Sequence, residues 1–78
     1  MSMNDVIAQN ISNLLKSSNK KQQDLADALN MPKQTISKIL NGARMVSATE
    51  LSQIAKYFNV SMDSLVQEKT NSVFSQIK

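Results

Sequence analysis

Hydrogen-bonding side chains crowd one short stretch of the sequence, residues 33–38. They are the ammonium, carboxamide and hydroxyl groups of Lys33, Gln34, Thr35, Ser37 and Lys38. A carboxamide donates and accepts at once, a hydroxyl has one proton to donate, and an ammonium group only donates. Apolar residues recur among them at helical spacing, so that Ile36 and Leu40, with part of Ile39, are expected to face a core. The stretch therefore predicts a short helix with one buried side and one side suited to hydrogen-bonded recognition.

The composition argues against catalysis. The sequence contains no histidine and no cysteine, which removes the commonest general base and metal ligand. Cysteine nucleophiles, disulfides and thiolate metal sites are excluded as well. Because the carboxylates do not cluster, we expect a binding protein and not an enzyme, with no metal and no cofactor.

Length and hydropathy limit the class of protein further. A chain of 78 residues is expected to form one small domain with a modest core. No apolar run approaches the roughly 20 residues that span a bilayer, and residues 1–10 do not resemble a signal peptide. Since the lack of cysteine also fits a reducing compartment, we expect a cytoplasmic protein with no membrane contact.

Positive charge is concentrated in the middle of the chain. Residues 16–44 hold six Lys or Arg and two Asp, whereas the other residues hold three Lys and four Asp or Glu. This asymmetry favours a face that binds a polyanion. An ordinary solvated surface remains the alternative reading of the same charges.

Start and stop signals divide the chain into five helices. The expected elements are residues 4–17, residues 22–29, a helix from Pro32 or Lys33 to about residue 40, a helix that a Ser47–Glu50 capping box begins, and residues 62–67. The stops are Asn-containing turns such as Asn30 and the Asn41-Gly42 pair. The second and third helices are thus joined by a turn of about three residues.

The order of several residues carries a resemblance to a known family. Gln22, Leu25-Ala26, Ile36, Asn41-Gly42, Ser47 and Leu65 follow one another at the expected spacing. Over about residues 4–66 the sequence resembles the phage-repressor and Cro type of helix-turn-helix, the XRE family of bacterial and phage regulators. The resemblance implies an all-α, compact five-helix domain similar to lambda repressor, over residues 1–67, with the third helix in the DNA major groove.

The resemblance also assigns roles to individual side chains. Lys33, Gln34, Ser37 and Lys38 match positions that commonly read bases, and Thr35 can add a contact to a base or a phosphate. Gln22 and Asn41 match phosphate contacts, and Arg44 could reach a phosphate or the minor groove. The alternative is that each is an ordinary surface side chain.

Three positions depart from the family pattern. Lys21 replaces the usual cap of the second helix, so that this helix is expected to begin less firmly or to use Asn19. Asn30 replaces a glycine in the turn. Lys33 replaces a glutamine that supports the one beginning the second helix, which puts that bridge in doubt and favours direct contact between Lys33 and DNA.

Taken together, these features predict a sequence-specific regulator of transcription, a repressor that binds an inverted-repeat operator in double-stranded DNA as a homodimer. Residues 68–78 form a linker or a dimerisation segment, where Val73, Phe74 and Ile77 could share one apolar face. The alternative function is an antitoxin or another protein-interaction module with a protein partner.

Overall fold

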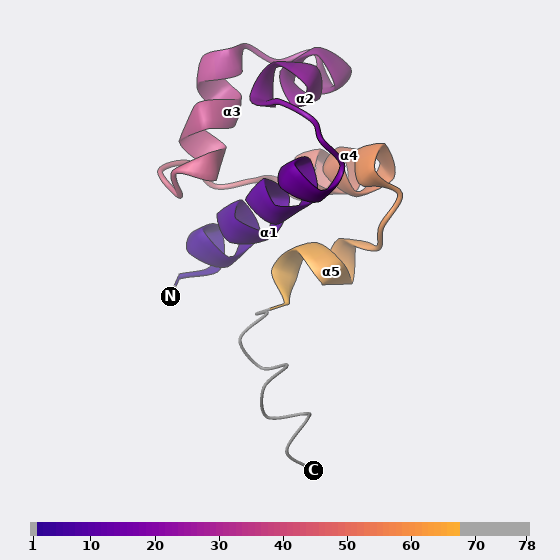
Figure 1. Ribbon diagram of the computed structural model, residues 1–78. Helices are drawn as coiled ribbons and strands as arrows, with labels where there is room; N and C mark the ends of the chain where they lie inside the picture. Colours follow the sequence, from indigo (N-terminus) through magenta and orange to yellow (C-terminus); the bar gives the residue numbers. More distant parts are fainter. Residues whose placement is uncertain (1, 68–78) are drawn as a thin grey trace.

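The computed structural model describes residues 2–67, which form five helices and no strand. The helices are α1 (Met3–Ser17), α2 (Gln22–Leu29), α3 (Lys33–Leu40), α4 (Ala48–Phe58) and α5 (Met62–Val66). Figure 1 shows α2 and α3 next to each other at one end of the domain, with α1 and α4 beside them and α5 at the opposite end. The predicted all-α fold with five helices is confirmed.

Serine hydroxyls fix the starts of three helices. Ser2, Ser47 and Ser61 accept hydrogen bonds from the backbone N–H three residues later, at donor–acceptor distances of 3.1–3.3 Å. At α4 the Glu50 carboxylate returns the interaction by accepting from the Ser47 N–H at 3.0 Å. The predicted capping box is therefore confirmed, and it satisfies two N–H groups that have no partner inside the helix.

Of the two expectations for the start of α2, the loss of the usual side-chain cap is confirmed and the use of Asn19 is not. No side chain accepts a hydrogen bond from the first N–H groups of this helix. The Asp24 carboxylate instead accepts from the Lys21 backbone N–H at 2.9 Å. Asn19 does not cap α2, because it is the left-handed residue that ends α1, with φ +58°.

The first four helices end with the same backbone geometry. Each is followed by a residue with positive φ, and these residues are Asn19, Asn30, Gly42 and Asn59. After each of them the next N–H donates to the carbonyl five residues back, at 2.8–3.0 Å. This pattern is the Schellman motif, which satisfies carbonyls that the helix end would leave unpaired. The turn between α2 and α3 thus has one defined geometry.

The core lies where α1 meets the other helices. Its fully buried members come from all five helices: Ile11, Leu25, Ala26, Ile36, Ile39, Ile54 and Leu65. Leu40 is half-buried and packs against this core, as expected, whereas Ile39 is only 2% exposed and contributes more than the part expected of it. Ile36 and Ile39 are three residues apart and share the inner side of α3, which leaves the opposite side to solvent.

A buried polar side chain joins the first helix, α1, to the last described helix, α5. Asn10 of α1 is 2% exposed, and its carboxamide nitrogen donates to the carbonyls of Leu65 and Gln67, both at 2.8 Å. Since both amide protons are used, the end of α5 is held against α1 by a pair of directed bonds. This role does not follow from the sequence pattern, because an Asn inside an amphipathic helix ordinarily points to solvent.

Replacing Gly42 by alanine should destabilise the domain by about 1–2 kcal/mol. Gly42 has φ +74°, and an added Cβ would collide with the Asp5 carboxylate. Thermal unfolding followed by circular dichroism measures the loss. In the Asp5→Ala background the collision is gone while the backbone strain remains, so Gly42→Ala should still destabilise there, but less. Equal stability of Gly42→Ala and the unsubstituted protein would contradict the strained geometry.

Candidate nucleic-acid interface

The outer side of α3 carries most of the residues predicted to contact a ligand. Lys33, Gln34, Lys38 and Asn41 are exposed, and Ser37 lies half-buried among them. At about 100° per residue these five share one side of the helix. The helix therefore presents a single polar face, which we call the α3 face, directly opposite the buried Ile36 and Ile39.

Thr35 lies apart from the α3 face. It is half-buried and is turned by about 160° around the helix from Ser37. Five of the six residues predicted on α3 and at its C-terminal end therefore lie together on the α3 face. Thr35 lies nearer the side of the helix that packs on the rest of the domain.

The first residue of α2 is linked to the α3 face. The Ser37 hydroxyl donates to the Gln22 carboxamide oxygen at 2.9 Å. Lys33 replaces the glutamine that supports Gln22 in the family pattern, and the bridge to Gln22 is made instead from Ser37, one helical turn later. Because its oxygen is held by Ser37, Gln22 keeps both amide protons for another partner.

Arg44 is anchored by the start of α4. Its guanidinium donates to both Glu50 carboxylate oxygens at 2.9 Å and to the Met45 carbonyl at 3.1 Å. The Arg44 side chain is 37% exposed and that of Glu50 is 14% exposed. These bonds use three of the five guanidinium N–H donors, so that two remain for a phosphate. The pairing was not anticipated from the sequence, although the two residues lie six positions apart.

The Arg44 guanidinium and the Ser47 N–H lower the pKa of Glu50 from 4.5 to about 2. Hydrogen bonding to Glu50 in turn raises the pKa of Arg44. Both shifts favour the charged forms, because each charge is stabilised by the other and by directed hydrogen bonds.

The Glu50 pair should make stability depend on pH below 5. A lowered pKa in the folded state stabilises the domain above the unfolded value near 4.5, and this contribution is lost as the pH falls toward 2. Glu50→Gln is expected to lose roughly 1–2 kcal/mol at pH 7 and to approach the unsubstituted protein near pH 2. Urea unfolding at several pH values measures this difference. Arg44→Gln is the control. It should reduce, but not abolish, the dependence of the unfolding free energy on pH, because the Ser47 N–H still donates to Glu50. If Glu50→Gln remains as much less stable than the unsubstituted protein at pH 2 as at pH 7, the Glu50 carboxylate is not the source of the pH dependence.

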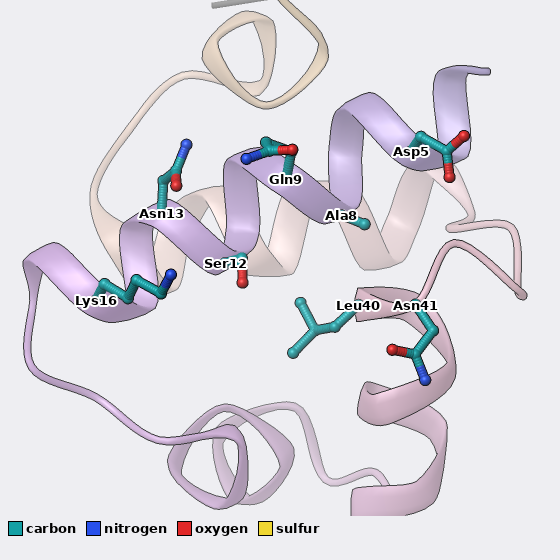
Figure 2. A pocket seen from close by; sticks show the side chains of 8 residues that line it. All are labelled: Asp5, Ala8, Gln9, Ser12, Asn13, Lys16, Leu40 and Asn41. Carbon is teal, nitrogen blue, oxygen red and sulfur yellow. The ribbon is translucent and has the colours of Figure 1, made fainter. Parts of the chain in front are cut away.

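A shallow polar groove adjoins the end of the α3 face. It has a volume of about 340 Å³, and Figure 2 shows Leu40 and Asn41 on one side with Ser12 and Lys16 of α1 on the other. The remaining lining side chains are Asp5, Ala8, Gln9 and Asn13. Polar surface therefore continues from Asn41 onto α1, although Asp5 places a negative charge in the same groove.

Residues 2–67 match neither of two other kinds of structure, a metal site or a membrane span. That range holds no group of three or more His, Cys, Asp or Glu residues placed to bind a metal ion. None of the helices described there is both long and apolar enough to cross a membrane.

A sequence model of helix-turn-helix domains matches residues 11–65, which is more than half of the chain. The chain belongs to the XRE family of helix-turn-helix proteins. The matched range contains α2, the left-handed turn at Asn30 and α3, which are the helix-turn-helix unit itself. Membership of this family indicates a DNA-binding regulator of transcription.

Solved structures share the fold of this XRE-family protein. A hypothetical transcription factor, NHTF, from Neisseria superposes with a TM-score of 0.86 at 14% identity, covering 94% of this chain and 84% of that one. A transcriptional regulator from Listeria innocua superposes with a TM-score of 0.72 at 29% identity, covering 91% of this chain and 71% of that one. No curated protein matches the sequence.

The apolar residues proposed for dimerisation, Val73, Phe74 and Ile77, lie outside the described residues. The contacts assigned to the α3 face, to Gln22, Thr35 and Arg44 remain predictions, and the division of this XRE-family chain into residues 1–67 and 68–78 also remains one.

Proposed function

We propose that this chain is a sequence-specific repressor that binds an inverted-repeat operator as a homodimer, with α3 in the major groove. The observation that carries the proposal is the α3 face, a continuous set of exposed donors and acceptors on a helix that is anchored by Ile36 and Ile39. The family supports DNA as the ligand. A helix fits the major groove, where each base pair presents a distinct hydrogen-bonding pattern.

The chemistry of the α3 face suits base edges. The Gln34 carboxamide can pair with N6 and N7 of adenine as acceptor and donor together. Lys33 and Lys38 can donate to O6 and N7 of guanine. Since all three side chains are exposed, none of them has to leave a partner in the core in order to bind.

Residues around the α3 face would hold the DNA backbone. The N-terminus of α2 has no side-chain cap, so its free N–H groups and positive dipole end suit a phosphate. Gln22 sits at that terminus with two free amide protons, and Asn41 and Arg44 flank the other end of α3. Such contacts fix the register of the protein on the duplex more than they select sequence.

Dimerisation would come from the tail or from α5. One domain covers only a short half-site, and two domains related by a twofold axis would read half-sites on the order of 34 Å apart. Light scattering on the full chain and on a chain that ends at Gln67 tests residues 68–78 as the interface. If both chains are dimeric, residues 68–78 are not the sole dimer contact. If both chains are monomeric in the absence of DNA, a preformed dimer is contradicted.

Selection of preferred duplexes from a random pool tests the proposed function. We expect an inverted repeat to be recovered, and binding to weaken with salt along a straight line in log–log form, because phosphate contacts release counterions. Equal affinity for every duplex would contradict sequence-specific binding. Absence of duplex binding together with a co-purifying protein bound away from the α3 face would favour the alternative function, an antitoxin or protein-interaction module.

A further inference from the structure

Ser37 differs from two other serines in described helices, Ser17 and Ser64, in what its hydroxyl does. Ser17 and Ser64 donate to backbone carbonyls three residues back, at 3.2 and 2.6 Å. Ser37 instead donates across to a side chain of another helix, the Gln22 carboxamide oxygen at 2.9 Å. A serine hydroxyl has a single proton, so this bond commits the whole donor capacity of Ser37.

Because the Ser37 proton is already donated to Gln22, Ser37 has no proton left to donate to a ligand. Its oxygen keeps lone-pair capacity and is partly exposed, so it can still accept a hydrogen bond. Ser37 also lies in the middle of the α3 face, with Lys33 one turn before it and Asn41 one turn after it. A base edge at the centre of this face therefore contacts the Ser37 oxygen, which can accept a hydrogen bond but cannot donate one to the base.

Base edges in the major groove differ in whether they can donate. Adenine offers its N6 amine and cytosine its N4 amine, whereas guanine and thymine offer acceptors, O6 with N7 and O4 respectively. An acceptor that faces guanine or thymine would leave two lone pairs opposed, with no proton between them. An acceptor that faces adenine or cytosine forms a hydrogen bond.

We propose that Gln22, by holding the Ser37 proton, makes Ser37 an obligate acceptor that selects an adenine or a cytosine at one position of each half-site. The proposal rests on the proposed DNA-binding function and adds a specificity determinant to it. Gln22 acts here as a positioning residue, because it shapes the base preference through Ser37 while its own amide protons face the DNA backbone.

Two substitutions of Gln22 separate this role from a plain phosphate contact. Gln22→Glu keeps an oxygen that accepts the Ser37 proton and removes the amide protons. It should weaken binding to all duplexes alike and keep the preference for adenine or cytosine. Gln22→Met also removes the amide protons, but it frees the Ser37 hydroxyl to donate. It should therefore let guanine and thymine bind at the same single position.

The experiment measures binding of the full chain to its preferred duplex and to every single-base-pair variant of it. The unsubstituted protein should favour adenine or cytosine at one position by roughly 3- to 10-fold, the range for one net hydrogen bond. Ser37→Ala and Gln22→Met should each flatten that position to within about twofold and leave the other positions unchanged. Gln23→Met is the matched control, because Gln23 bonds to Asp27 of its own helix at 2.8 Å and not to α3.

The outcomes distinguish the inference from the function on which it depends. Salt-sensitive, sequence-selective binding in which Gln22→Met leaves every base preference intact would overturn the inference alone. A chain with no salt-sensitive duplex binding would overturn the proposed function and the inference with it. Circular dichroism melts of each variant confirm that the compared proteins are folded.

Discussion

Gln34→Ala should lower the affinity for the preferred operator by roughly 5- to 150-fold for each half-site, which corresponds to about 1–3 kcal/mol. Gln34 is exposed on the α3 face, and its carboxamide can donate to and accept from one adenine together. In a dimer the substitution occurs in both subunits, so that the loss at a full inverted repeat is about twice as large in free energy.

Competition between specific and random duplexes measures this effect. Because Gln34 is expected to touch a base and not a phosphate, random duplexes should bind about as well as before, and the salt dependence should keep its slope. Gln53→Ala is the matched control, since Gln53 is also an exposed glutamine but lies on α4. An equal loss for specific and random duplexes would contradict base reading by Gln34.

Asn10→Ala should cost about 2–4 kcal/mol of folding free energy, which is a large part of the stability of so small a domain. The substitution leaves the buried Leu65 carbonyl and the Gln67 carbonyl without their donor. It also opens a small cavity, because Asn10 is 2% exposed. Both effects act at the contact between α1 and α5.

Chemical unfolding of Asn10→Ala beside Asn13→Ala measures this contribution. Asn13 lies on the same helix one turn later and is exposed, so its replacement should change stability by less than about 0.5 kcal/mol. Asn10→Leu should not restore stability, because a leucine supplies no proton for the two carbonyls. A stable Asn10→Ala protein would show that the two hydrogen bonds contribute little.

The features that the sequence predicted well are local ones. The capping box at Ser47 and Glu50, the helix stop at Gly42 and the left-handed Asn30 each depend on residues a few positions apart. The three-residue turn between α2 and α3 follows from the same signals. Since the core pattern is periodic, it identified Ile36 as a member of the interior.

The features that were missed join residues distant in the chain. Gln22 and Ser37 are 15 residues apart, and Asn10 lies 55 and 57 residues from its two partners. No periodicity specifies such pairs, because they depend on how whole helices cross. The Arg44–Glu50 pair is shorter in sequence, but its geometry follows from the path of the loop before α4 and not from spacing.

The Asn10 bonds also affect the order in which the domain can be completed. During synthesis α1 emerges first, and α2 and α3 can pack on each other soon after they appear, because their contacts are local. One partner of Asn10, Gln67, is the last residue that the structure describes, and the other, Leu65, lies two positions before it. Until both have left the ribosome, this amide lacks at least one of its two acceptors, so we expect α1 to keep one incompletely protected side. The chain therefore closes its interior in a single late step, after the helix-turn-helix unit has been made.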